Sequence, residues 1–234
     1  MKKTILSLMA FIAFTFLFIS CSKKSNITLV GEAHHIKEIQ DKELELYRDF
    51  YEKGGRHLFI ERGYSMASYM NFIMRQEEPF KSMLEDGPEA DLDFYQAIKD
   101  NFPETIFHGI DAELSTFGES WLQFLQKNNF GTEKEYKTII EVIEQGKKFH
   151  SLGYSKDVYR EECLTKNFFR EYKKVKGQPI FGIFGSAHTS KTVMWIKGTP
   201  TMGMNLEKKR IHYEEIKLDN VLELIRLSGV KNEK

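Results

Sequence analysis

The stretch ITLVGEAHH, residues 27–35, joins a run of aliphatic and β-branched residues to a cluster of polar side chains. A short apolar run bounded by glycine predicts a buried strand over the first four of these residues. Gly31, Glu32, His34 and His35 follow at the point where such a strand gives way to a loop. A carboxylate and two imidazoles in that position indicate a functional site at the end of the strand.

The rest of the chain alternates buried strands with amphipathic helices. Strands are predicted by apolar or alternating runs at residues 27–30, 57–60, 105–110, 179–185 and 211–218, the last as an edge strand. Helices are predicted by apolar side chains at helical spacing over residues 36–53, 132–150, 155–174 and 219–228. This order predicts an α/β fold in which helices flank a largely parallel central sheet.

The segment from 64 to 84 is rich in methionine and aromatic side chains. Most of these side chains are expected in the core. Adaptable methionines also line ligand pockets, so a helical lid over the carboxyl edge of the strands is a second expectation for the segment.

Polar side chains follow each predicted strand, and parallel strands deliver such side chains to one edge of a sheet. The second run ends at Glu61 and Arg62, the third at Asp111, and the fourth at a GSAH sequence that closes on His188. The pattern Gly-x-x-His follows both the first and the fourth strand, where glycine permits a close backbone approach. Any one of these residues alone would be expected to cap a helix or face solvent. Their convergence predicts a site.

The helix predicted over residues 155–174 carries further candidates. Arg160, Leu164 and Asn167 share one face at i, i+4 and i+7, so Arg160 and Asn167 are expected to face the sheet edge. The alternative is an amphipathic helix whose arginine extends into solvent. Cys163 lies beside this face and is expected to be a small buried hydrophobe. Four other histidines are expected to be structural, namely His57, His108, His150 and His212.

The N-terminus has the pattern of an export signal. Residues 1–20 place a short basic start before an apolar run, and the sequence FISC ends on Cys21, which resembles the lipobox of bacterial lipoproteins. Cys21 would then carry lipid, residues 21–26 would form a tether, and residues 27–234 would form a single α/β domain. The expected location is the bacterial cell envelope, at the periplasmic or extracellular face of a membrane. An uncleaved N-terminal anchor is the alternative.

The composition narrows the classes of function. The 234 residues suffice for one domain with a substantial core. The chain has 34 basic and 34 acidic residues without a long block of like charge, a balance that gives no indication of nucleic-acid binding. Once Cys21 carries lipid, Cys163 is left without a second cysteine for a disulfide, so packing must stabilise the domain.

Together these motifs resemble the superfamily of the erythromycin esterases, the ChaN-type haem-binding lipoproteins and the Tiki/TraB proteins. VGEAHH resembles the Gly-Glu-Ala-x-His of the esterases and the Gly-Glu-x-His of the haem binders, and FIER resembles their second acid-bearing strand. HGID and FGSAH are similar to the esterases' Gly-Phe-Asp and Asn-Ala-His, and TPTMGMNLEKKRIHYEEI to their Met-Gly-x-x-Leu and late strand. REECLTKNF resembles their Arg-Asp-x-x-Met-Ala-x-Asn helix, matched at Arg160, Glu161, Leu164 and Asn167. The resemblance covers residues 27–218.

The leading interpretation is an exported hydrolase that cleaves an ester or amide bond in a small molecule or peptide. His34 or His35, oriented by Glu32 or Glu61, would take a proton from the attacking water. The esterase pattern places the histidine at His35 and the Gly-x-x-His pattern places it at His34, so both stay candidates. Further roles are expected for His188 in catalysis, for Arg160 at the oxyanion, and for Asp111, Glu161 and Asn167 as supports. The sequence contains no Gly-x-Ser-x-Gly motif for an acyl-serine route.

The sequence is compatible with two kinds of cofactor, a divalent metal ion and haem. Glu32, His34, Glu61 and His188 form a mixed nitrogen and oxygen set that suits zinc, manganese or cobalt, and a bound ion would activate water. The second interpretation, which the resemblance implies, is a lipid-anchored haem-binding protein for iron uptake, with His34 or Tyr64 as the axial ligand. A third is a member of the superfamily that binds a partner and catalyses nothing.

Overall fold

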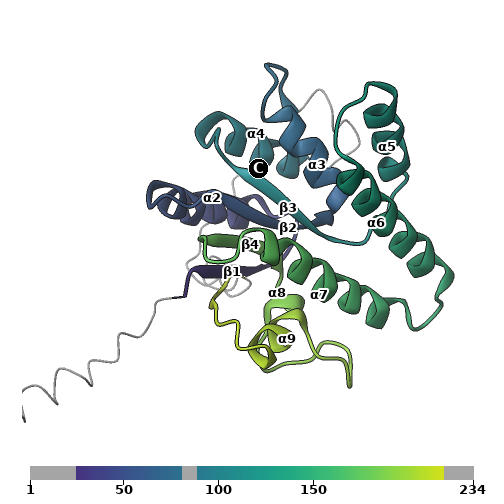
Figure 1. Ribbon diagram of the computed structural model, residues 1–234. Coiled ribbons are helices and arrows are strands. Elements are labelled where there is room, and N and C mark those ends of the chain that lie inside the picture. Colours follow the sequence, from purple (N-terminus) through teal and green to yellow (C-terminus); the bar gives the residue numbers. More distant parts are fainter. Residues whose placement is uncertain (1–24, 81–88, 219–234) are drawn as a thin grey trace, which may run out of the picture.

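The computed structural model describes residues 25–80 and 89–218 (Figure 1). Most of the tether predicted at residues 21–26 lies outside the described residues, and so do four other predicted features, wholly or in part. They are the signal peptide, lipidated Cys21, the last residues of the 64–84 segment and the helix at 219–228. These remain predictions.

The described residues form a sheet of five parallel strands in the order β3-β2-β4-β1-β5. The strands are β1 (Ile27–Glu32), β2 (His57–Gly63), β3 (Ile106–Asp111), β4 (Ile180–Gly185) and β5 (Glu214–Lys217). The predicted α/β fold with a largely parallel sheet is confirmed. The strand predicted at 211–218 lies at the edge, as expected, and β4 lies between β1 and β2. This order places the carboxyl ends of β1, β4 and β2 side by side.

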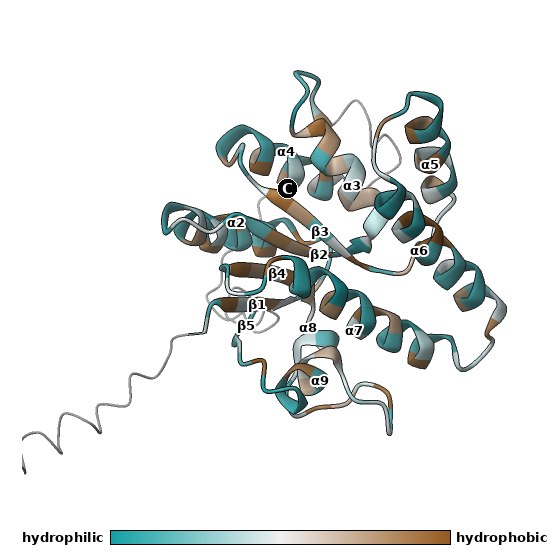
Figure 2. Ribbon diagram, viewed as in Figure 1, coloured by the Kyte–Doolittle hydropathy of each residue, from teal (hydrophilic) through white to brown (hydrophobic). Residues whose placement is uncertain are grey.

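One face of the sheet packs against three helices that follow β1 and β2 in the chain. These are α2 (Lys37–Glu52), α3 (Tyr64–Ile73) and α4 (Glu89–Asn101). Val30, Ile60 and Ile183 point into this layer and are almost completely buried. Figure 2 shows apolar strands at the centre and hydrophilic stretches on the helices around them.

The opposite face packs against α7 (Lys156–Lys174) and α9 (Met202–Lys208), which Figure 1 shows on the other side of the sheet from α3 and α4. Leu29, Phe59 and Phe184 point into this second layer. The residues of β1, β2 and β4 therefore alternate between two apolar layers, which explains why these strands begin with almost continuously apolar runs, whereas the edge strand β5 is polar and partly exposed.

Two more helices, α5 (Phe117–Lys127) and α6 (Glu133–Ser151), form an antiparallel pair beside α3. Trp121, Leu125, Ile139 and Ile143 form their shared core. A single turn, α8 (Ser186–Thr189), follows β4 directly. None of the helices in the described part of the chain is both long and apolar enough to span a membrane.

The structure corrects several predicted boundaries. The predicted helices at 36–53, 132–150 and 155–174 agree with α2, α6 and α7 to within one residue at each end, whereas α4, α5, α8 and α9 had not been assigned. Both β1 and β2 run further than their apolar residues, so Glu32 and Glu61 belong to strands and do not follow them.

The helical cover over the carboxyl edge comes from a different segment than the sequence indicated. Met70, Ile73 and Phe80 of the predicted lid are buried in the first apolar layer. The side chains that stand over the sheet edge belong to α4, at Asp91, Phe94 and Tyr95. The expectation that the 64–84 segment is mostly core is met within its described residues.

Candidate functional site

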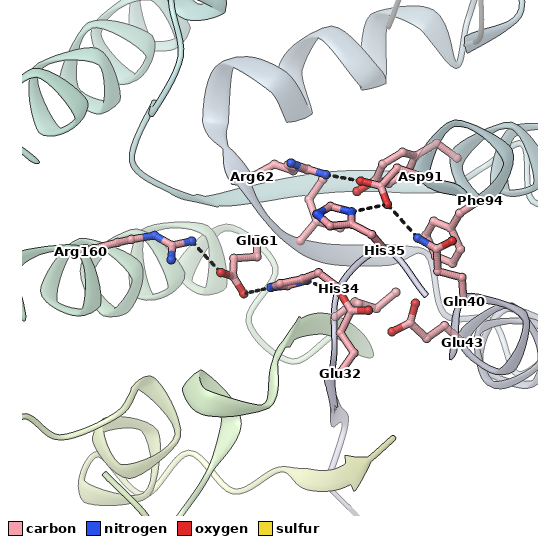
Figure 3. A pocket seen from close by; sticks show the side chains of 13 residues that line it. Glu32, His34, His35, Gln40, Glu43, Glu61, Arg62, Asp91, Phe94 and Arg160 are labelled. Atoms are coloured by element: carbon pink, nitrogen blue, oxygen red, sulfur yellow. Dashed lines mark hydrogen bonds and ion pairs between the residues drawn. The ribbon is translucent and has the colours of Figure 1, made fainter. Parts of the chain in front are cut away.

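A cavity of about 160 Å³ opens at the carboxyl ends of β1, β2 and β4 (Figure 3). Its walls come from these strands, from the turn after β1, and from helices α2, α4 and α7. The polar lining residues are Glu32, His34, His35, Gln40, Glu43, Glu61, Arg62, Asp91, Tyr95 and Arg160. The predicted convergence of strand-end residues is therefore observed.

Glu61 is the central carboxylate of this site. Its Oε1 lies 2.6 Å from Nη2 of Arg160 and 3.4 Å from Nε2 of His188, and its Oε2 lies 3.6 Å from Nε2 of His34. The backbone N–H of Gly185 donates to the same Oε2 over 2.8 Å. Burial opposes the charged form, but the hydrogen bonds from His188 and His34 and the charge of Arg160 hold the pKa of Glu61 well below its ordinary value.

His34 lies between two carboxylates. Its Nδ1–H donates to Oε1 of Glu32 over 2.8 Å, while its Nε2 faces Glu61. The hydrogen bonds to Glu32 and Glu61 raise the pKa of His34 to about 10, so the ring is an imidazolium at neutral pH. Gly185 leaves the space that the ring occupies, because a Cβ at this position would lie 3.0 Å from Nε2 of His34.

His188 forms a second carboxylate–imidazole pair behind Glu61. Its Nδ1–H donates to Oε2 of Glu161 over 2.5 Å, and its side chain is 6% exposed. Burial lowers the basicity of the ring, but the hydrogen bonds to Glu161 and Glu61 outweigh it and raise the pKa of His188 to about 9. Unlike His34, His188 does not line the cavity. The structure therefore places it as a support for Glu61.

The two candidates on α7 face the sheet edge, as their spacing predicted. Nε and Nη2 of Arg160 both donate to Oδ2 of Asp111, over 3.0 and 2.5 Å, and Nη2 also reaches Glu61. Asn167 is fully buried and donates to the backbone carbonyl of Asp111 over 3.3 Å. Asp111 thereby fixes the guanidinium of Arg160 at the cavity wall. The alternative of a solvent-facing arginine is wrong.

His35 has a different environment from His34. The extended backbone ends before it, and its φ of 64° turns the ring toward α4. Its Nδ1–H donates to Oδ1 of Asp91 over 2.9 Å, and Arg62 and Gln40 also donate to that carboxylate. Nε2 of His35 has no hydrogen-bond partner among the described residues. The predicted strand alternation, with His35 on the opposite side from His34, does not extend this far, and both rings line one cavity with centroids 5.8 Å apart.

Sequence reasoning missed Asp91 and Glu43. Asp91 lies in the first turn of α4, where an acid is common because it interacts well with the helix dipole, so its position alone carries little information. Glu43 did carry a signal. Ile39, Glu43 and Tyr47 are spaced at i, i+4 and i+8, which places Glu43 in the middle of the apolar face of α2. Acidic side chains are rarely buried without a partner, so an acid at this position indicates a functional or structural role.

The remaining candidates lie apart from this cavity. Tyr64 lines a separate cavity of about 500 Å³ with Trp121, and its ring lies under Arg170 and Lys174. Cys163 is buried, as expected.

The four histidines expected to be structural all lie outside the cavity lining. His57 and His108 are buried against one another, with 3.0 Å between Nδ1 and Nε2. His150 and His212 are exposed, and they contact a backbone carbonyl and Glu207, respectively.

The predicted metal ligands have suitable donor types, but their arrangement does not fit a metal ion. Both ring nitrogens of His34 face carboxylates, and Arg160 occupies Oε1 of Glu61. In residues 25–80 and 89–218, no group of three or more His, Cys, Asp or Glu is arranged to hold a metal. A metal at this position would have to compete with the guanidinium of Arg160 for Oε1 of Glu61.

The surroundings of His34 also do not fit haem. The cavity beside His34 is about 160 Å³, well below the roughly 300–1,000 Å³ of common ligand sites. His34 has no free ring nitrogen to bind iron, and Tyr64 lies in the other cavity. The geometry therefore argues against His34 as a haem ligand, and the alternative ligand Tyr64, in its cavity of about 500 Å³, stays a prediction.

No protein-family model matches the sequence, and no curated protein matches it. Solved structures do match the fold. A Bacillus cereus protein has a TM-score of 0.58 at 14% identity, with 82% of this chain and 65% of that chain covered. A succinoglycan biosynthesis protein also has a TM-score of 0.58, at 13% identity, with 82% and 66% covered. The chain thus spans slightly less than two thirds of both.

A mutant of the erythromycin esterase EreC in its open conformation is similar as well. Its TM-score is 0.58 at 12% identity, with 87% of this chain and 72% of that chain covered. These three likenesses show that the chain shares the α/β fold of the matched structures. At these identities the fold alone is shown, and the chemistry has to be argued from the site.

Proposed function

We propose that the protein is a hydrolase that cleaves an ester or amide bond, with His35 as the general base. The observation that carries the proposal is the Asp91–His35 pair at the cavity wall. Asp91 accepts the Nδ1–H and so fixes the tautomer in which Nε2 is free to accept a proton. His34 is a poor base by contrast, because it is already protonated and both its nitrogens face carboxylates.

The other side of the cavity supplies positive charge. The guanidinium of Arg160 lines the cavity and would stabilise the negative charge that develops on the carbonyl oxygen, and the charge of His34 would add to this stabilisation. Water between the two rings would transfer a proton to His35 while its oxygen attacks the carbonyl carbon. When the tetrahedral intermediate collapses, the bond to the leaving group breaks, and His35 returns the proton to that group. Glu61, Asp111 and His188 keep the cations in place.

The fold supports this class of reaction, because an erythromycin esterase has a similar structure. The proposed route uses water as nucleophile and groups of the chain alone, so it assigns no step to a metal. We further propose that Cys21 is lipidated after export, as its FISC context indicates. Metabolic labelling with a radioactive fatty acid tests this, and a Cys21→Ser variant that still incorporates label would contradict it.

The test of the proposed hydrolase is an assay of the full chain on a panel of small esters and dipeptide amides. His35→Gln is expected to lower kcat/KM by about a hundred- to ten-thousand-fold, the usual contribution of a general base. His212→Gln is the matched control, because His212 is exposed and lies outside the cavity lining. Equal activity of the wild type and His35→Gln would refute the assignment of the base.

A further inference from the structure

Two carboxyl groups meet in one corner of the cavity. Glu43 reaches it from α2 with 1% of its surface exposed, and Glu32 reaches it from β1 with 9% exposed. Figure 3 shows the two groups next to one another on the side away from Arg160. Oε1 of Glu32 binds His34, but Oε2 of Glu32 and Oε1 of Glu43 are buried without a hydrogen-bond partner among the described residues.

Within this corner Glu32 pairs with His34 through Oε1, whereas the carboxyl group of Glu43 has no positive partner of its own among the described residues. Asp91 pairs with Arg62, and Glu61 pairs with Arg160. Glu43 is almost completely buried, and its Oε1 and the Oε2 of Glu32 have no hydrogen-bond partner among the described residues. A buried carboxylate pair is costly unless a proton or a cation lies between the two groups.

We propose that Glu43 and Glu32 bind an ammonium group of the substrate, carried on a short aliphatic arm from the scissile carbonyl. This inference rests on the proposed hydrolase and names its substrate class as amine-bearing esters or amides. An ammonium has three donors, which match the two unpaired oxygens and leave one for water or substrate. Ile60, Ile183 and Phe94 line the same small cavity and provide apolar surface for the arm.

An ammonium suits this corner better than a divalent metal. Two unpaired carboxylate oxygens are fewer than the six or more ligands that magnesium or calcium takes. The third nearby acid, Asp91, already accepts from Gln40, His35 and Arg62. A monovalent cation that needs only hydrogen bonds requires no rearrangement of those groups.

The first experiment measures binding, independently of turnover. Propylammonium is titrated into the full chain by calorimetry, with n-propanol as the neutral probe. Propylammonium is expected to bind and propanol is not. Glu43→Gln is expected to weaken propylammonium binding about tenfold or more, since a hydrogen bond to a charged group contributes about 1.5–3 kcal/mol. Glu38→Gln, an exposed change on the same helix, should leave it unchanged. Equal binding by the wild type and Glu43→Gln would overturn the proposal.

A second variant guards against misfolding. Glu43→Asp keeps the carboxyl group but withdraws it by one methylene, and it should weaken binding in the same direction. If MgCl₂ or ZnCl₂ binds in a Glu43-dependent manner and propylammonium does not, the corner is a metal site and the proposal is wrong.

The second experiment measures specificity with two esters of similar shape, β-alanine ethyl ester and ethyl butanoate. The wild type is expected to prefer the ammonium ester by about tenfold or more in kcat/KM, and Glu43→Gln should abolish the preference. A preference that survives in Glu43→Gln overturns the inference. If the wild type hydrolyses neither ester, the hydrolase itself is in question, and the calorimetric result then decides the ammonium site alone.

Discussion

The guanidinium of Arg160 lies 2.6 Å from the carboxylate of Glu61, although 99 positions separate the two residues. The contact joins helix α7 to strand β2 at the carboxyl edge of the sheet. Glu61 also faces His34 and His188, so one carboxylate contacts three basic side chains at this edge of the sheet. Substitutions at Glu61 should therefore affect activity and stability together.

Glu61→Gln is expected to reduce the free energy of unfolding by about 1–3 kcal/mol, because neutral glutamine loses the charge-assisted hydrogen bonds. Turnover should fall with it, since Arg160 and His34 lose their shared anchor. Denaturant unfolding and ester assays measure the two effects. Glu104→Gln, at an exposed ion pair with Arg56, is the control and should cost under about 1 kcal/mol. Equal losses in both variants would contradict the central role of Glu61.

Stability should decline toward alkaline pH. The pKa values of His34 and His188 rise from 6.5 to about 10 and about 9 on folding, so both rings bind protons more tightly in the folded protein. Their contributions are complete below pH 6.5, decline as the pH rises, and are lost above about 9 for His188 and about 10 for His34. Glu61, whose pKa is lowered, acts oppositely and loses its contribution in acid. Denaturant unfolding at a series of pH values checks this, and constant stability from pH 6.5 to 10 would contradict it.

Gly185→Ala should impair turnover more than stability. The φ of Gly185 is −51°, which alanine adopts without strain, so the effect is steric. The new Cβ would lie 3.0 Å from Nε2 of His34 and push the imidazolium away from Glu61. Gly153→Ala is the control, because no heavy atom lies within 4 Å of a Cβ there. Unchanged kcat/KM in Gly185→Ala would show that the position of His34 is not critical.

Asp91→Asn should lower kcat/KM about a hundred- to ten-thousand-fold while the fold is retained. The amide cannot hold the Nδ1–H tautomer of His35 as the carboxylate does, so Nε2 is no longer fixed as the acceptor. Steady-state kinetics measure the loss of kcat/KM, and circular dichroism shows whether the fold is retained. Asp41→Asn, at an exposed pair with Lys37, should be neutral. Full activity in Asp91→Asn would remove His35 from the mechanism.

Chelation should leave the activity unchanged. The groups of the chain supply both the base and the positive charge in the proposed route, so dialysis against a chelator is expected to have no effect on kcat/KM. The measurement compares treated protein with and without added zinc, manganese or cobalt. Lost activity that one of these ions restores would show that the predicted metal ligands act as such.

Much of the framework was predictable from local pattern. The apolar runs located the five strands, and the parallel order then required Glu61, Asp111 and His188 to meet at one edge. Helical spacing likewise oriented Arg160 and Asn167. These inferences succeed because strand alternation and helix periodicity are properties of short segments.

The rest depended on tertiary contacts. The φ of 64° at His35 turns its ring away from the environment of His34 and so determines which of the two histidines has a free nitrogen. The local sequence does not predict this left-handed backbone conformation at a histidine. The partner of His35, Asp91, comes from a helix 56 positions further along the chain. The rule that functional side chains lie at the carboxyl ends of parallel strands identifies only residues at those ends. It could not identify the side chains that α2 and α4 contribute to the cavity.

The central place of β4 has a consequence for how the protein acquires its shape. β1, β2 and β3 are synthesised first, yet β1 and β2 do not pair with one another, and each waits for β4 to come between them. The sheet can close only after residue 185 is available, when the N–H of Gly185 meets Glu61. Such long-range pairing slows folding. Before β4 is available, only β2 and β3 can pair, β1 has no partner strand, and the cavity at their carboxyl ends cannot form.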